Sequence, residues 1–282
     1  MVAGWEWDDT LFEGSAAYYR RGRLPYAPGL ADLLAGVLRP DGRGRLLDVG
    51  CGPGILALDL AHLFEEVVGV DPDRGMIAEA GREARRRGAA GKARWVRARA
   101  EELPAGLGRF GVATFGQSFH WMDRERVAAT VRAMLLPGGA LVHISDLKTG
   151  PRNVDGLPHP AVPGPAVGEL IRHYLGPVRR AGRGVLPQGT PGDEAAILAR
   201  AGFRGPQRHV VPGGQPLERC ADDVVAEVFS MSFSAPHLFG PRRDAFEADL
   251  RRLLRDSSGS GRFSDRLPGT EVFVWGKDSA QP

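Results

Sequence analysis

The sequence predicts an α/β fold in which a mostly parallel sheet is wrapped on both faces by helices. Three observations support this: apolar strand-like segments alternate with helical segments over residues 45–146, a glycine-rich loop joins the first strand to the next helix, and an apolar segment at 270–276 returns to the sheet. Such alternation indicates right-handed strand–helix–strand crossovers. Sheets of this kind bind ligands at the carboxyl ends of their strands, where the strand order reverses.

Hydrophobic periodicity and turn residues predict the first elements in order. Residues 28–38 carry leucines on one helical face, begin with Pro28 and are followed by the helix-breaking run Pro40-Asp41-Gly42. Asp123 is the predicted N-cap of a helix that ends before Pro137-Gly138-Gly139. The predicted strands are 45–50, 67–71, 94–97, 110–116 and 140–146, and the predicted helices between them are 55–63, 73–88 and 123–135.

The strand–helix rhythm fails after Lys148. Residues 149–192 are rich in Gly, Pro and Arg and show little periodicity. The elements expected beyond them are a helix at 193–201 ended by Gly202, a strand near 207–211, helices near 218–231 and 241–255, and a strand at 270–276. We interpret residues 1–282 as a single domain, because the last strand returns to the sheet. Its expected parts are an N-terminal helical lid (1–40), a core (41–148), and insertions at 149–192 and 213–262 that cap the site.

Composition and charge exclude several function classes. The 37 basic and 34 acidic residues of the 282-residue chain give a net charge of +3, which is too balanced to indicate nucleic acid. Cys51 and Cys220 lack paired spacing, and the seven histidines form no ligand pattern, so we expect no metal. No apolar run approaches the ~18 residues of a membrane span, and no leader is visible. We therefore expect a cytoplasmic monomer or homodimer without a membrane partner.

The run Leu47-Asp48-Val49-Gly50-Cys51-Gly52-Pro53-Gly54 takes a strand into a Gly-x-Gly-x-Gly loop and then into a helix. Glycines at such a turn let the backbone bend sharply and approach a ligand closely. Asp71 ends the next strand, where a carboxylate can accept both hydroxyl hydrogens of a ribose. These features fit any nucleoside cofactor.

The loop favours S-adenosylmethionine (SAM) over a dinucleotide. A dinucleotide loop reads G-x-G-x-x-G and directs backbone N–H groups at a pyrophosphate. Here Ile55 replaces the third glycine, and Pro53 has no N–H to donate. SAM carries no phosphate. The remoter alternatives are an NAD(P)-dependent oxidoreductase and a SAM-binding protein without catalytic activity.

Three stretches resemble class I SAM-dependent methyltransferases of the ubiquinone/menaquinone-biosynthesis type. They are D-V-G-C-G-P-G at 48–54, V-G-V-D-P-D-R-G-M at 68–76 and A-E-E-L-P at 100–104. The resemblance covers residues 12–147 well. It implies a Rossmann-like, doubly wound sheet of seven strands, mostly parallel with the last strand antiparallel, and helical and loop insertions that cap the active site.

The resemblance also implies cofactor-binding residues. Tyr19 and Arg23 match an N-terminal motif that approaches the SAM carboxylate, although Leu24 and Ala27 replace its usual prolines. The other implied residues surround the rest of SAM. The methionyl part is near Asp48, Gly50 and Gly52, and the ribose is held by Asp71. The adenine is near Pro72, Met76, Ala100 and Glu101, and the sulfonium or amino group is near Gly116 and Gln117. Competing interpretations are a purely loop-holding Asp48, a core Met76 and a helix-start Glu101.

Methyl transfer from a sulfonium needs neither a metal nor an acid, because a neutral thioether leaves. His120 is the candidate general base or substrate donor, with a bracing role as the alternative. Phe119 and Trp121 are expected to face the substrate, and Asp146 can contact it from the end of its strand. We therefore expect methyl transfer to a small molecule, a hydroxyl of a secondary metabolite or quinone-like compound, with S-adenosylhomocysteine (SAH) as product. C- or N-methylation is the alternative.

Overall fold

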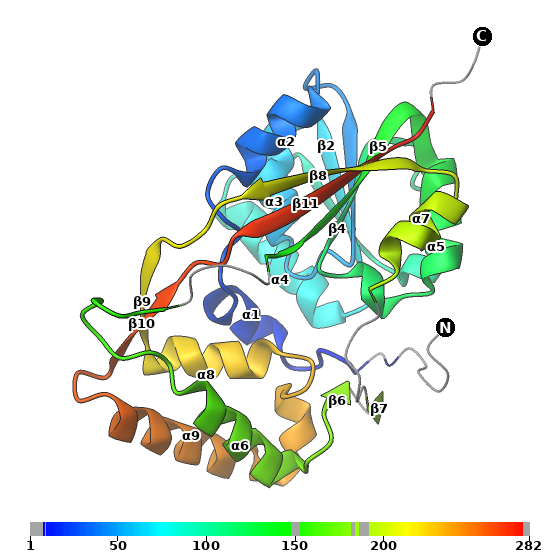
Figure 1. Cartoon of the computed structure of the whole chain (residues 1–282). Coiled ribbons are helices and arrows are strands. Elements are labelled where there is room, and N and C mark those ends of the chain that lie inside the picture. Colours follow the sequence, from blue (N-terminus) through cyan, green and yellow to red (C-terminus); the bar gives the residue numbers. More distant parts are fainter. Residues whose placement is uncertain (1–7, 9, 148–152, 182–183, 186–191, 279–282) are drawn as a thin grey trace.

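Seven strands form the central sheet of the computed structural model, which describes residues 8, 10–147, 153–181, 184–185 and 192–278 (Figure 1). They are β1 (Arg45–Val49), β2 (Glu66–Asp71), β3 (Ala93–Arg97), β4 (Phe110–Gly116), β5 (Leu135–Asp146), β8 (Arg204–Val211) and β11 (Thr270–Gly276). Their order across the sheet is β3-β2-β1-β4-β5-β11-β8. Strands β1 to β5 pair in parallel, whereas β11 is antiparallel to both β5 and β8. The predicted sheet, with its antiparallel last strand, is therefore confirmed.

The direction of strand order reverses at β1. From β1 the chain continues outward through β2 and β3, whereas β4 and β5 lie on the other side of β1. Leu47 of β1 pairs with Val68 of β2 on one side and with Ala113 of β4 on the other. The carboxyl ends of β1 and β4 therefore meet at the reversal point, where doubly wound sheets bind their ligands.

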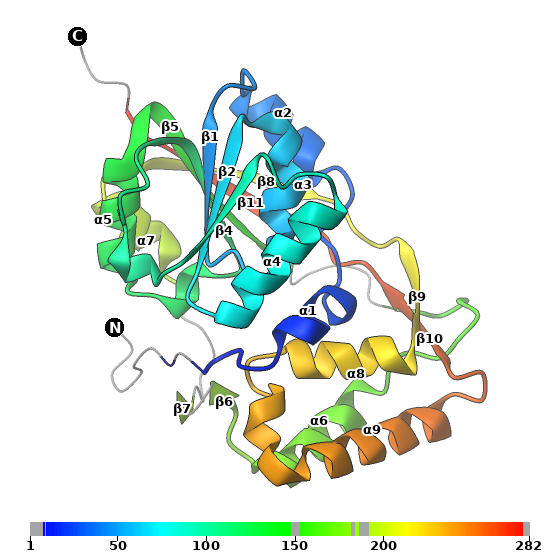
Figure 2. The ribbon, with the colours of Figure 1, turned by 180° about the vertical axis from the view of Figure 1, so that it is seen from behind.

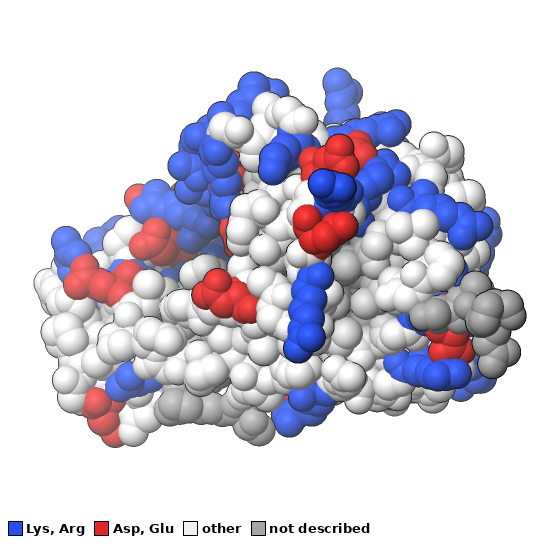
Figure 3. Space-filling view, turned by 90° about the horizontal axis from the view of Figure 1, so that it is seen from above, with Lys and Arg blue, Asp and Glu red and all other residues white. Residues whose placement is uncertain are grey.

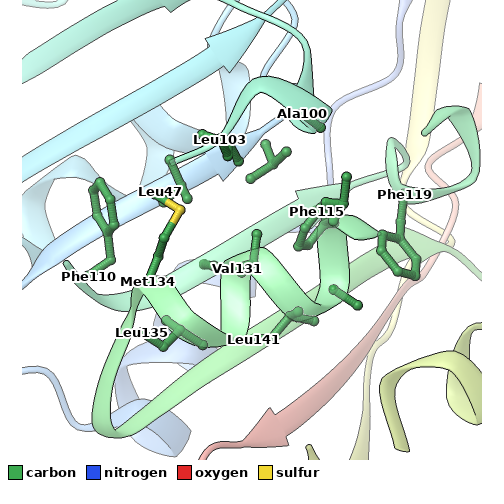
Figure 4. Close-up of a cluster of buried hydrophobic side chains, with 14 of the residues drawn as sticks. Leu47, Ala100, Leu103, Phe110, Phe115, Phe119, Val131, Met134, Leu135 and Leu141 are labelled. Atoms are coloured by element: carbon green, nitrogen blue, oxygen red, sulfur yellow. The ribbon is translucent and has the colours of Figure 1, made fainter. Parts of the chain in front are cut away.

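Helices cover both faces of the sheet, which explains why its central strands are continuous apolar runs. The flanking helices are α2 (Leu30–Leu38), α3 (Ile55–Leu60), α4 (Arg74–Arg86), α5 (Arg124–Met134) and α7 (Glu194–Arg200). Leucines of α2 and α3 pack in one buried cluster with Val67 and Val142 of the sheet. Residues of α5 and α7 pack in a second cluster with Phe110, Phe115 and Leu141 (Figure 4).

Side chains and glycines at the helix ends explain why these helices begin and end where they do. Asp73 accepts a hydrogen bond from the backbone N–H of Met76 (2.8 Å) at the start of α4. Asp123 accepts one from Arg126 (3.2 Å) at the start of α5, which confirms its predicted N-cap role. Gly202 follows α7 with a φ of +87°, a left-handed conformation that ends helices.

A smaller, mainly helical part of the chain packs beneath the carboxyl edge of the sheet in the views of Figures 1 and 2. It contains α1 (Ala16–Gly22), α6 (Gly164–Leu175), α8 (Ala221–Ser230), α9 (Arg243–Ser257) and the antiparallel pair β9 (Pro216–Cys220) and β10 (Arg262–Arg266). Phe229, Phe246, Leu250 and Phe263 are buried in a core of its own. The short elements of the chain are β6 (Arg180–Ala181), β7 (Gly184–Val185) and 3-10 turns at Ala61–Leu63, Ala100–Glu102, Phe119–Trp121 and Pro236–Arg242.

The structure corrects the sequence-based elements in three places. Helix α6 lies in the segment expected to lack periodicity, because the surrounding Gly and Pro hide its apolar positions Val167, Leu170, Ile171 and Tyr174. The expected helix at 218–231 begins at Ala221, because the residues before it pair with β10. Strand β5 begins directly after α5 rather than after the Pro-Gly-Gly turn. Position 148, the last of the expected core, and positions 149–152, 182–183 and 186–191 of the first expected insertion lie outside the described residues.

Candidate functional site

Two adjoining cavities lie at the carboxyl ends of β1, β2 and β4. The larger has a volume of about 260 Å³ and the smaller about 70 Å³. Tyr19, Gly50, Gly52, Gly116 and Gln117 line both, so the two cavities form one continuous site. The sheet supplies its floor, and α1, α8 and β10 supply residues of the larger cavity on the opposite side.

The glycine loop is fixed to β2 and leaves room at one position. The backbone N–H groups of Gly50 and Cys51 both donate to the carbonyl of Val70 (2.8 and 3.0 Å). A Cβ at Gly50 would lie 2.6 Å from Cβ of Ser118, so no larger residue fits there. Gly52 has a φ of +54° and meets nothing within 4 Å of its Cβ position. The loop therefore presents bare backbone to a ligand.

Asp71 holds the loop and lines the smaller cavity at once. Its Oδ2 accepts a hydrogen bond from the backbone N–H of Gly52 (2.9 Å), and its Oδ1 accepts one from Asp73 (2.9 Å). Burial raises the pKa of this carboxyl to about 6 despite those two bonds. A polar ligand that donates hydrogen bonds to Asp71 would relieve that penalty.

Asp48 lies in the floor of the larger cavity and is 1% exposed. Its Oδ1 accepts a hydrogen bond from the Thr114 hydroxyl (2.7 Å), whereas its Oδ2 has no partner among the described residues. Burial raises the pKa of this carboxyl to about 7. A buried acceptor left without a donor is costly and is typical of a site completed by a ligand.

Tyr19 and Arg23 of the N-terminal motif also reach the site. The Arg23 guanidinium lies 4.9 Å from the centroid of the Tyr19 ring, and its Nη2 donates to the carbonyl of Ser230 (3.0 Å). Its Nε is buried without a partner in the described part of the chain. The larger cavity therefore has an unsatisfied donor on Arg23 as well as an unsatisfied acceptor on Asp48.

The residues expected around an adenine line the smaller cavity: Pro72, Met76, Ala100 and Glu101. Glu101 has a second role, because its Oε1 accepts a hydrogen bond from the backbone N–H of Asp123 (2.6 Å) and so fixes the start of α5. Both interpretations of Glu101 are compatible with this geometry.

Gln117 adopts a backbone conformation that is uncommon for a residue with a side chain. Its φ is +53°, while its backbone N–H donates to the carbonyl of Ile144 (2.9 Å). Gly116 precedes it, and a Cβ there would lie 2.6 Å from the Tyr26 hydroxyl. Backbone held in this way is concentrated at ligand sites, because it aims groups that a relaxed strand end would not.

Only some of the residues expected to face the substrate line the two cavities. Trp121 lines the smaller cavity and Asp146 the larger. Phe119 is instead 1% exposed and packs with its ring centroid 5.0 Å from that of Phe115, so it is a core residue (Figure 4). The His120 ring lies 4.7 Å from that of Trp121, and His120 is not among the described residues that line either cavity. The 3-10 turn at Phe119–Trp121 sends successive side chains in different directions.

Several lining residues went unrecognised in the sequence. They come from the chain between 213 and 268 or from the N-terminal segment: Leu11, Phe12, Glu227, Met231, Asp265, Arg266 and Pro268. No local motif surrounds them, since only the folding of the helical part against the sheet brings them to the site.

Within the described residues, no group of three or more His, Cys, Asp or Glu side chains is arranged to hold a metal ion. Among those residues there is also no helix long and apolar enough to cross a membrane.

Known methyltransferase sequences resemble the part of this chain that contains the glycine loop at 48–54. A family model of the methyltransferase domain matches residues 46–139. The uncharacterized methyltransferase Rv3342 of Mycobacterium tuberculosis is 33% identical over 135 residues, which are 48% of this chain and 51% of that protein. CRG1 of Saccharomyces cerevisiae, described as a probable S-adenosylmethionine-dependent methyltransferase, is 30% identical over 101 residues, or 34% of each chain. The matched regions thus span 51% and 34% of the length of these two relatives.

Solved structures agree on the fold. The YcgJ protein of Bacillus subtilis aligns with a TM-score of 0.50 and 17% identity, covering 89% of this chain and 98% of that one. The [4+2]-cyclase SpnF aligns with a TM-score of 0.50 and 22% identity, covering 89% of this chain and 81% of that one. At these identities the similarity shows the architecture alone.

Proposed function

We propose that this chain transfers the methyl group of SAM to a small-molecule acceptor and releases SAH, because residues 46–139 match a model of the methyltransferase domain and the relatives it matches are described as methyltransferases. The observation that carries the proposal is the continuous site with unpartnered atoms of opposite character. Among the described residues Oδ2 of Asp48 lacks a donor and Nε of Arg23 lacks an acceptor, and both residues line the same cavity. The amino-acid end of SAM carries an ammonium and a carboxylate, which match these two groups.

The remaining residues of the site fit the rest of this molecule. Asp71 presents a carboxylate suited to two ribose hydroxyls, and Pro72 and Met76 present apolar surface suited to an adenine. Tyr19 lines both cavities, so its ring can face a sulfonium between them. SAM supplies an activated methyl group when bound, and we propose that these residues hold it in one orientation.

Catalysis in this proposal rests mainly on positioning, which can contribute roughly 7–11 kcal/mol in favourable cases. The acceptor oxygen forms a bond to the methyl carbon while the methyl–sulfur bond breaks and its electron pair stays on sulfur. The acceptor proton passes to a base on the protein. Asp146 is the better candidate for this base, because it lines the larger cavity at the end of β5.

Substitution of the two candidate bases separates their roles. Asp146→Asn should lower kcat about 10²–10⁴-fold, the usual range for loss of a general base, with little change in SAM affinity. His120→Ala should leave kcat unchanged, because His120 is not among the described residues that line the cavities. Steady-state kinetics at saturating SAM would measure both. A large loss in His120→Ala with none in Asp146→Asn would reverse the assignment.

The acceptor class is proposed from chemistry and surface charge. Basic side chains predominate on the face shown in Figure 3, but acidic ones lie among them, and the net charge of the chain is only +3, so we propose no nucleic-acid acceptor. The segments at 164–175 and 221–257 form the helical part opposite the sheet, and we propose that they cap the acceptor end of the site. A hydroxyl acceptor remains our preferred class, with C- or N-methylation as the alternative.

Calorimetry tests the proposal directly. The full chain should bind SAM and SAH and should show no comparable affinity for NAD or NADP. Transfer of labelled methyl from SAM to a panel of phenols, alcohols and amines would then establish the reaction. Tight binding of a pyridine dinucleotide without binding of SAM would exclude the proposed function.

The affinity for SAM should depend on pH through Asp48. Its pKa of about 7 in the free protein means that the carboxyl is largely protonated below that pH. An ammonium binds the ionised form, so affinity should fall by up to tenfold for each pH unit below 7. Titrations between pH 5.5 and 8.5 should show this slope, and Asp48→Asn should remove it while the weaker step of Asp71 near pH 6 remains. A flat wild-type profile would contradict the role of Asp48.

A further inference from the structure

The helical part contributes two carboxylates to the larger cavity, and a buried arginine holds both. Glu227 of α8 and Asp265 of β10 line the cavity, with side chains 29% and 30% exposed. Arg219 of β9 lies behind them and is 4% exposed. Its Nη1 donates to Oε2 of Glu227 (2.6 Å) and lies 3.3 Å from Oδ2 of Asp265. One guanidinium therefore fixes two cavity-lining groups on different elements.

Arg219 also ties this pair to the cofactor side of the site. Its Nη2 donates to the carbonyls of Asp223 (3.0 Å) and Gly22 (3.4 Å). Gly22 is the last residue of α1 and precedes Arg23, whose guanidinium lines the same cavity. The arginine thus sets α1, α8 and β10 relative to one another, with its charge matched by carboxylates rather than left unpaired.

The carboxylates lie on the opposite side of the cavity from the sheet. Asp48 and Gly116 belong to β1 and β4, whereas Glu227, Asp265 and Arg266 belong to the helical part. The Arg266 guanidinium is already engaged, since it donates to the carbonyls of Asn153 (2.6 Å) and Gly214 (2.8 Å). Carboxylates accept hydrogen bonds and donate none, so a molecule bound against this wall must supply the donors.

The charged residues that line the cavity also favour a bound molecule that donates hydrogen bonds. Among the described lining residues away from the cofactor-binding pair Asp48 and Arg23, three are acidic and one is basic: Asp146, Glu227, Asp265 and Arg266. Leu24, Tyr26, Met231 and Pro268 complete the wall with mostly apolar surface. Arg219 behind the wall offsets part of this charge, which leaves a net excess of one negative charge, so an anionic molecule bound here is disfavoured by like charge in a confined space.

We infer that Glu227 and Asp265, held by Arg219, are specificity-determining residues that select acceptors with a hydrogen-bond donor, a hydroxyl or a protonated amine, and reject anionic ones. The inference rests on the proposed function, because it assigns this wall to the acceptor rather than to SAM.

Three probes of one size test the inference on the full chain saturated with SAH: benzyl alcohol, benzylamine and benzoate. Their dissociation constants would be measured by NMR titration. Benzoate should bind at least about tenfold more weakly than the best of the other two. The order of the alcohol and the amine tells which donor the wall prefers, and either order supports the inference as long as benzoate is last.

Variants assign the discrimination to these residues. Glu227→Gln and Asp265→Asn each remove one charge without changing the size of the side chain. Each should therefore lower the ratio of the dissociation constant of benzoate to that of benzyl alcohol. Arg219→Lys keeps the charge but loses the forked geometry, so it should weaken probe binding, and it should weaken SAH binding less, because its hydrogen bond to α1 is the longest of its contacts. Glu218→Gln is the matched control, because Glu218 lies on β9 beside Arg219 but pairs with Arg262 and is not among the described lining residues.

The outcomes separate the inference from the proposed function. A chain that binds no SAM or SAH contradicts both. A chain that binds SAH but shows equal affinity for the three probes, or a preference for benzoate, contradicts the inference alone. Unchanged discrimination in both Glu227→Gln and Asp265→Asn would also contradict it.

Discussion

Replacing Gly22 by alanine should push α1 away from α8 and destabilise the protein on the order of 3 kcal/mol. A Cβ at this position would lie 2.2 Å from the carbonyl carbon and 2.3 Å from the carbonyl oxygen of Ala226. Backbone atoms of α8 cannot rotate away as a side chain can, so the whole helix must move. Because α1 carries Tyr19 and Arg23, the shift should also weaken SAM binding.

Chemical denaturation of Gly22→Ala and wild type would measure this loss, and calorimetry with SAH would measure the effect on the site. Gly36→Ala is the matched control. Gly36 lies in α2, is exposed, and has nothing within 4 Å of its Cβ position, so alanine there should raise stability by about 0.5–1 kcal/mol. Equal stability of Gly22→Ala and wild type would mean that α1 and α8 are not packed as described.

The sheet could be predicted from the sequence because its determinants are local. Strand β1 is apolar and buried, the glycine loop follows at once, and strand β4 was predicted with its observed bounds. Parallel strands covered on both faces need continuous apolar runs, and such runs are visible without knowing what they pack against. Asp71, which lines the smaller cavity, ends β2 and follows from the same pattern, whereas Pro72, Met76 and Ala100, which also line it, were expected from the resemblance to methyltransferases.

The wall that the helical part adds to the larger cavity could not be predicted, because its determinants are pairings between distant segments. Arg219, Glu227 and Asp265 meet only when β9 pairs with β10 across a helical segment. Each alone is an ordinary charged residue in an amphipathic stretch. His120 and Phe119 are not among the described lining residues for a similar reason. The directions of the side chains in this one-turn 3-10 helix depend on the packing of Phe119 into the core.

The two buried aspartates lower the stability of the ligand-free protein when they are ionised. Burial raises the pKa of Asp48 to about 7 and that of Asp71 to about 6, both above the value of about 3.9 expected in an unfolded chain. Unfolding between these values releases protons, so their contribution to stability falls as pH rises from about 4 to 7. Above about pH 7 the folded protein therefore keeps two ionised, buried carboxylates, at a cost that a cationic or donor-rich ligand removes.

Replacing Asp71 by asparagine should consequently stabilise the free protein while largely abolishing SAM binding. The amide removes a buried charge, so the melting temperature without ligand should rise, and the gain should be larger at pH 8 than at pH 5 because the aspartate is protonated at the lower pH. Loss of charge-assisted hydrogen bonds, worth about 1.5–3 kcal/mol each, should weaken SAM affinity by ~10²-fold or more. Thermal melts at the two pH values and calorimetry with SAM measure both effects.

Asp59→Asn controls for the Asp71 substitution, because Asp59 is 42% exposed on α3 and pairs with Arg87 away from the site. It should change neither SAM affinity nor the pH dependence of stability. If Asp71→Asn lowered the melting temperature at pH 8, the carboxylate would be stabilising the loop through Gly52 more than its burial costs. If SAM affinity survived, the sugar of the methyl donor would have to be held by other groups. A gain in stability together with a loss of binding would show that this carboxylate is retained for the ligand and not for the fold.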